Sequence, residues 1–179
     1  MANKSIPRIE GILQYYTKAL GANYNAYRNH VYRVYHLTLL LIKKEIDQTT
    51  QEQLAIAASF HDLGIWTHNS MDYLGPSSDL SDQYIKENAM NNEVSVRQII
   101  DHHHKLSPYK GENAQIVESF RKADLIDLSS GYIKFGLPAS FYQNLKDEFP
   151  FLGFHRLIYG KVIKHAISHF WKPFPMMKK

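Results

Sequence analysis

Apolar residues recur along most of this chain with the three- to four-residue spacing of amphipathic helices. Strict alternation of apolar and polar residues, the pattern of a half-buried strand, is hard to find. The sequence therefore predicts an all-α fold of seven or eight helices. The expected helices cover roughly 7–20, 25–44, 50–64 and 79–90, then two segments that begin at Asn91 or Asn92 and at Asn113, and finally 138–148 and 154–171.

Turn and capping residues set the expected ends of these helices. Thr50 and Gln53 have the spacing of a capping box, and Ser78 is a suitable N-cap for the helix that follows it. Between Gly64 and Ser78 the chain is rich in Gly, Pro, Asn, Asp and Ser, which predicts a loop of about fifteen residues. A loop of that length is expected to have a functional role.

The composition narrows the class of protein. Hydrophobic residues make up 44% and charged residues 21% of the 179 positions, values typical of one globular domain rather than a disordered chain. The absence of cysteine excludes disulfide scaffolds, thiolate metal sites and cysteine nucleophiles. There is no apolar run long enough for a membrane span and no apolar N-terminal signal, so we expect a soluble, cytoplasmic protein without a membrane partner.

The net charge of +4 is unevenly distributed. Residues 1–148 carry 15 basic and 17 acidic residues, whereas residues 149–179 carry six basic residues and no acidic one. A basic end can recruit nucleic acid or another anionic surface, or it can be a solvated helix face. We expect the solvated face, and therefore no nucleic-acid partner.

The dipeptide His61-Asp62 is the strongest chemical signal, because it ends an apolar helix. A buried charged pair is costly unless something compensates it, and a divalent cation does so. Adjacent residues of a helix diverge by about 100°, so other helices must supply further ligands. His30 and Asp124 each interrupt an apolar stripe with a group that can bind metal. A hydrogen-bonded core histidine is the alternative interpretation of a single such position.

The order His30, His61-Asp62, Asp124 on successive helices resembles the H…HD…D signature of the HD-domain superfamily of metal-dependent phosphohydrolases. The segment 30–34 is similar to that family's first motif, in which arginine follows histidine by three residues, and 123–127 is similar to its last. The resemblance implies a helical core over about 24–128 in which His30, His61, Asp62 and Asp124 bind a divalent metal, followed by a C-terminal helical extension over about 138–179. This donor set suits one or two ions of Mn, Fe, Co, Ni or Zn.

The triplet 102–104 adds three more imidazoles at the end of a predicted helix. His103 shares the apolar face of that helix and His104 begins to leave it, whereas His102 is expected to face solvent. In many members of the superfamily, histidines at this place bind a second metal or the substrate phosphate, and His103 and His104 are the candidates for that role. A polar helix end, with cations placed favourably at the C-terminal dipole, is the alternative.

Several other residues are candidates for substrate binding or proton transfer. Lys105 and Arg121 could clamp an anion, although Arg121 could instead neutralise Glu118 or Asp124. Ser77 and Ser78, at an expected helix start, could offer backbone N–H groups to phosphate, or could be plain N-caps. The glutamate that HD nucleotidases often place three residues after the dyad is replaced by Ile65, which leaves Asp72 as the nearest general acid or base beside Asp62.

These features predict a single-domain, metal-dependent hydrolase of the HD type, acting on a small phosphate ester or nucleotide-like substrate. Two alternatives remain open. The same site in an HD-type hydratase or a di-iron oxygenase would act on a small molecule, and five or six His and Asp ligands would favour the two-iron case. A non-catalytic regulatory module would instead hold a structural metal and use its basic end to meet nucleic acid.

Overall fold

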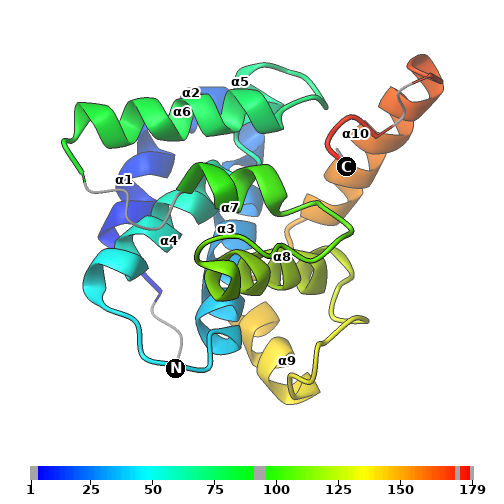
Figure 1. Ribbon diagram of the computed structural model, residues 1–179. Coiled ribbons are helices and arrows are strands. Elements are labelled where there is room, and N and C mark those ends of the chain that lie inside the picture. The colour runs from blue at the N-terminus through cyan, green and yellow to red at the C-terminus, as the bar shows by residue number, and fades with distance from the viewer. Residues whose placement is uncertain (1–3, 91–95, 172–173, 178–179) are drawn as a thin grey trace.

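The computed structural model describes residues 4–90, 96–171 and 174–177. All regular secondary structure within these residues is helical, and eight of the ten α-helices there have seven or more residues (Figure 1). The prediction of an all-α fold is confirmed. The helices are α1 (Pro7–Tyr15), α2 (Thr17–Leu20), the 3-10 turn η1 (Gly21–Asn23), α3 (Tyr24–Leu41), α4 (Gln48–Phe60), α5 (Gly64–Thr67), α6 (Leu74–Glu87), α7 (Val96–His102), α8 (Ala114–Leu128), α9 (Ala139–Glu148) and α10 (Phe154–Ser168).

Helix α3 runs through the middle of the molecule (Figure 1). Its most extensive pairing is with α8, and it also packs on α1, α4 and α10. The predicted stripe of Tyr27, Val31 and Val34 is fully buried, and the buried apolar residues of the described chain form one cluster around it. A helix that is covered on most sides is a suitable place for a buried functional group, and His30 lies within this stripe.

The ends of two elements differ from the sequence prediction. Helix α4 is capped by Asp47, whose carboxylate accepts a hydrogen bond of 2.7 Å from the backbone N–H of Thr50, so the proposed capping box at Thr50 is wrong. Helix α6 begins at Leu74 rather than after Ser78. Pro76 is tolerated there because a helix's first turn lacks intrahelical partners for its N–H groups.

The expected loop of about fifteen residues is correspondingly short. Residues 64–67 form α5 and only 68–73 connect it to α6. Gly64 permits this close packing, because a Cβ atom there would lie 2.6 Å from the Tyr73 carbonyl oxygen and 2.9 Å from Ser77 Oγ. The turn after the dyad is thereby held against α6.

The remaining predicted helices agree in position with the structure. Helix α8 follows its expected N-cap Asn113, and α9 and α10 lie within a few residues of their expected ends. The proposed cap at Asn91 or Asn92 lies outside the described residues. The outer half of α10 projects from the bundle (Figure 1). No helix among the described residues combines the length and apolarity needed to cross a membrane.

Candidate metal centre

Six side chains from four parts of the chain meet at the centre of the bundle. His30 comes from α3, His61 and Asp62 from the turn after α4, His103 and His104 from the turn after α7, and Asp124 from α8. All except His104 are at most 2% exposed, and the side chain of His104 is 16% exposed. On α3 and α8 the ligands His30 and Asp124 are buried because positions one turn away on the same helix, Val34 and Phe120, are core residues.

One half of this cluster contains His30, His61 and one oxygen from each carboxylate. The Nε2 atoms of His30 and His61 are 2.9 Å apart. Asp62 Oδ2 lies 3.6 Å from both of these nitrogens, and Asp124 Oδ1 lies 3.6 Å from His30 Nε2 and 3.8 Å from His61 Nε2. The four residues that the HD resemblance implies as ligands therefore lie side by side.

The other half contains His103, His104 and the remaining carboxylate oxygens. His103 Nε2 is 3.4 Å from Asp62 Oδ1, and His104 Nδ1 is 3.5 Å from Asp124 Oδ2. Each carboxylate thus directs one oxygen toward each half of the cluster. His104 is oriented by Tyr73, whose hydroxyl lies 2.6 Å from its Nε2 atom.

Hydrogen bonds on the far side of the rings determine which nitrogens face the cluster. The Nδ1 atoms of His61 and His103 lie 2.8 Å and 2.6 Å from the backbone carbonyl oxygens of Ala58 and Ile100. A carbonyl can only accept, so Nδ1 carries the proton in both rings and Nε2 directs a lone pair inward. His30 Nδ1 lies 2.7 Å from Asp127 Oδ2 and is arranged in the same way.

Asp127 and Arg33 support His30 from behind. Arg33 Nε and Nη2 donate to the two Asp127 oxygens at 2.6 Å and 2.9 Å, and both side chains are completely buried. Burial would raise the pKa of Asp127, but the Arg33 guanidinium and the hydrogen bond with His30 hold it below its usual range. Arg33 and Asp127 lie within the two segments that resemble HD motifs, but the sequence alone assigns Asp127 no role. Its spacing of three residues from Asp124, one helical turn, is the signal that could have found it.

Within the cluster, the pKa values of chemically similar side chains shift in opposite directions. Burial lowers the pKa of His61 to about 3, whereas for His30 the nearby Asp127 and Asp62 outweigh burial and raise the pKa to about 9. Burial raises the pKa of Asp124, and the Asp62 carboxylate adds to that rise. For Asp62 itself, the surrounding histidines outweigh burial and lower the pKa. The two histidines, and likewise the two aspartates, thus favour opposite protonation states, as expected where like groups share one site.

The donor set fits a divalent metal ion. Asp62 Oδ1, His103 Nε2 and both oxygens of Asp124 are buried without a hydrogen-bond partner among the described residues. Buried polar atoms are normally satisfied, and a bound cation would satisfy all of these acceptors at once. Ligands about 2.1 Å from one ion lie about 3–3.5 Å apart, close to the separations within each half. The buried His and Asp groups could hold a metal ion.

A cavity of about 370 Å³ opens from the second half of the cluster. Asp62, His103, His104 and Asp124 form its polar wall, together with Lys105. Most of the other wall is apolar and comes from α8, α10 and the chain after α10, through Leu125, Leu128, Ile158, Val162, Phe174 and Met176. The cavity therefore presents metal-binding groups at one end and hydrophobic surface at the other.

The two basic residues expected to bind an anion, Lys105 and Arg121, differ in their contacts. Lys105 lines the cavity, as does Arg121. However, the Arg121 guanidinium forms a two-point ion pair with Glu118, at 2.9 Å and 2.8 Å, and donates to the Lys105 carbonyl oxygen. Of the two interpretations of Arg121, neutralisation of Glu118 is the one that the structure shows.

The phosphate site expected at Ser77 and Ser78 is wrong. Both residues lie inside α6 and are completely buried. Ser77 Oγ accepts a hydrogen bond of 2.9 Å from Gly64 N–H, and the Ser77 N–H donates to the Tyr73 carbonyl. Ser78 Oγ donates to Asp101 at 2.7 Å. Because the helix starts earlier than expected, these groups join α6 to its neighbours instead of facing a ligand.

Asp72 and His102 lie outside the cluster. Asp72 is not among the described residues that line the cavity, although its neighbours Met71 and Tyr73 are. His102 is half-buried, and its Nδ1 donates to the Gln98 carbonyl oxygen at 2.8 Å. The role of general acid or base assigned to Asp72 therefore has no geometric support.

Comparison of the chain with protein-family models, with curated proteins and with solved structures gives no match. The geometry of the centre is the basis for its interpretation.

Proposed function

We propose that this protein is a metal-dependent phosphohydrolase of the HD type that acts on a small phosphate ester. The observation that carries the proposal is the convergence of four histidines and two aspartates whose lone pairs face one another in the bundle centre. Such an open, mixed N/O site at the wall of a cavity is typical of catalytic rather than structural metal centres. This argument disfavours the regulatory module with a structural ion.

His30, His61, Asp62 and Asp124 would hold the primary metal ion. When bound, a divalent ion supplies Lewis acidity toward a phosphoryl oxygen and lowers the pKa of water. Asp127 and Arg33 keep the His30 ring in the tautomer that presents Nε2. Asp62 reaches both halves of the cluster, so its carboxylate can also accept a proton there.

The cavity supplies groups for an anionic substrate. Lys105 is half-buried at its wall, and among the described residues its ammonium group forms no ion pair, which leaves it able to bind a phosphate oxygen. Tyr73 and His104 form a hydrogen-bonded pair on the same wall and can orient that oxygen. The apolar remainder of the cavity favours an ester whose alcohol part is largely hydrophobic over a strongly polar one.

A two-metal centre is the second candidate, and a specific observation favours it. His103 and His104 stand opposite the second oxygens of Asp62 and Asp124, so the six residues divide into two donor sets joined by two carboxylates. Six His and Asp ligands are the number that favours a di-iron oxygenase. The same donor sets would also serve a two-metal hydrolase.

A metal-restoration experiment tests the proposed function. Purified protein is stripped with a chelator, reloaded with Mn, Fe, Co, Ni or Zn, and assayed for phosphate release from a panel of alkyl, aryl and nucleoside phosphates. We expect release that depends on the metal and is abolished in Asp62→Asn. Metal-loaded protein that releases no phosphate from any ester, while the iron form consumes oxygen with a small organic substrate, would reject the hydrolase in favour of the oxygenase.

A further inference from the structure

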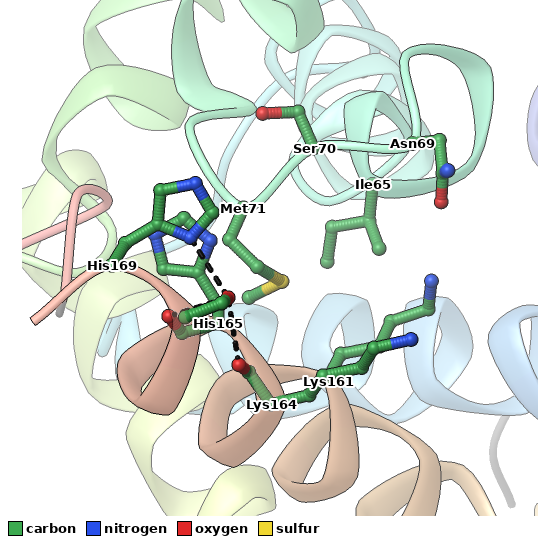
Figure 2. Close-up of a pocket in the computed structure, with 9 residues that line it drawn as sticks. Ile65, Asn69, Ser70, Met71, Lys161, Lys164, His165 and His169 are labelled. Carbon is green, nitrogen blue, oxygen red and sulfur yellow. Dashed lines mark hydrogen bonds between the residues drawn. The ribbon is translucent and has the colours of Figure 1, made fainter.

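A second cavity of about 420 Å³ lies outside the metal centre, between α10 and the connection from α5 to α6 (Figure 2). Four basic side chains line it from α10 and the residue that follows it, and the opposite wall carries no charged residue. From α10 come Lys161, Lys164, His165 and Ser168, followed by His169 directly after the helix, and the facing residues are Ile65, Asn69, Ser70 and Met71. The function proposed above assigns no role to this cavity.

The charge of the cavity is one-sided. Lys161, Lys164 and His165 are spaced by three and four residues from Lys161, which places them along one face of α10, and His169 follows as the C-cap of that helix. No acidic side chain is among the described residues that line it, and the two lysines form no ion pair within the described chain. Residues 149–179 contain no Asp or Glu at all. A concave surface of this kind concentrates anions.

The side chains are also arranged as donors around one space. Both lysine side chains extend toward the part of the cavity that bears Ile65 and Asn69, and the two imidazoles lie at its other end (Figure 2). The rings of His165 and His169 stack with centroids 4.2 Å apart. Ser70 Oγ accepts a hydrogen bond from the Asp72 N–H at 3.1 Å, which leaves its own proton to donate.

We propose that this cavity is a binding site for a phosphate-class oxyanion. Such an ion offers several acceptor oxygens and a charge near two, which matches two lysine ammonium groups beside imidazole and hydroxyl donors. On this proposal, basic residues near the end of the chain bind an anion instead of only forming a solvated helix face. The inference is independent of the proposed function, because none of the residues involved belongs to the metal centre.

The position of α10 relates the two cavities. Ile158, Tyr159 and Val162 of this helix face the metal-side cavity, whereas its basic residues face the second one, and Met71 lines both. The bound phosphate group can therefore belong either to a separate small ligand or to the far end of a substrate that enters the metal-side cavity.

Titration with inorganic phosphate tests the proposal directly. The imidazole resonances of His165 and His169 are assigned with His165→Gln and His169→Gln and followed by NMR at constant ionic strength, with chloride replaced by phosphate. We expect both resonances to shift and saturate. The double variant Lys161→Gln with Lys164→Gln should weaken phosphate binding by about tenfold or more, because two charge-assisted contacts are lost.

The matched control removes the same charge elsewhere. Lys18→Gln with Lys110→Gln changes two exposed lysines outside the cavity. Phosphate affinity should then change less than about twofold, because salt screens long-range interactions between charges. Phosphate binding at the metal centre would instead move the resonances of His103 and His104. Resonances of His165 and His169 that stay fixed, or that respond equally in both double variants, would overturn the proposal.

An activity measurement then separates the two sources of the phosphate group. If the site holds the far end of the substrate, Lys161→Gln with Lys164→Gln raises KM for a bisphosphate ester but leaves KM for the matching monophosphate unchanged. If it holds a separate ligand, neither KM changes. Both results presuppose the phosphate shifts at His165 and His169, which do not require the protein to be a hydrolase.

Discussion

At the scale of single residues, the site depends on atoms that face away from it as much as on those that face it. The Nε2 atoms of His30, His61 and His103 point into the cluster because Nδ1 of each ring is already engaged. Two of the partners are backbone carbonyls, and the third is the carboxylate of Asp127. Fixing a histidine by its outer nitrogen is a general way to prepare a metal ligand.

Asp127→Asn tests this support. The change leaves the buried Arg33 guanidinium without a counter-charge and weakens the hold on His30, so we expect a loss of about 3–5 kcal/mol in the free energy of unfolding. Metal affinity should fall by about 10–100-fold. Urea unfolding and competition with a chelator measure the two effects.

Tyr142→Phe is the matched control for that substitution. It removes only the hydroxyl that donates to Asp127 Oδ1 at 3.1 Å, and it leaves the charge pair with Arg33 in place. The expected cost is about 1 kcal/mol, with no change in metal affinity. Equal metal affinities in wild type and Asp127→Asn would show that Asp127 only stabilises the fold.

The sequence identified the metal-facing residues better than it identified the residues around them. His30, the dyad and Asp124 were predictable because each places a polar group on an apolar stripe. The sequence prediction is wrong for Ser77 and Ser78, and it leaves two interpretations of Arg121 open, because the partners of a hydroxyl or a guanidinium are set by tertiary packing. Which nitrogen of each ring faces the cluster also follows from packing and cannot be read from residue order.

At the scale of helices, the segment after the dyad shows why loop predictions fail. Its Gly, Pro, Asn and Ser content indicated a long loop, yet residues 64–67 and 74–87 are helical. Close packing of Gly64 against Tyr73 and Ser77 outweighs the local propensities. The same packing places Tyr73 beside His104, so the short connection from α5 to α6 forms part of the cavity wall.

Gly64→Ala is the prediction at this scale. The added methyl group would meet the Tyr73 carbonyl oxygen at 2.6 Å, a backbone atom that cannot move without shifting α6. We expect a destabilisation of about 1–3 kcal/mol, measured by chemical denaturation.

Gly160→Ala provides the comparison, because its Cβ would meet no atom within 4 Å and the position is helical. Alanine should there stabilise the protein by about 0.5–1 kcal/mol. If both substitutions changed the free energy of unfolding in the same direction, the contact of Gly64 with Tyr73 would not be the reason for glycine at that position.

At the scale of the whole molecule, the fold brings together residues that are far apart in the sequence. His30 and Asp124 lie on α3 and α8, which form the most extensive helix pairing, and the dyad and the histidine pair follow α4 and α7. The periodicity of the chain predicted these helices and their number, because each has a clear apolar face. It could not predict that α10 would separate a largely apolar cavity from a basic one, since that depends on how the last helix packs.

The metal content of the purified protein is the most direct test of the central claim that the six clustered side chains hold a metal. Mass spectrometry should find one or two divalent transition-metal ions per chain in wild type, and much less metal in His61→Ala and in Asp62→Ala, since each variant lacks a ligand of the primary set. His102→Ala, which alters the histidine of the triplet outside the cluster, should retain the wild-type content. Full metal occupancy in both His61→Ala and Asp62→Ala would contradict the account.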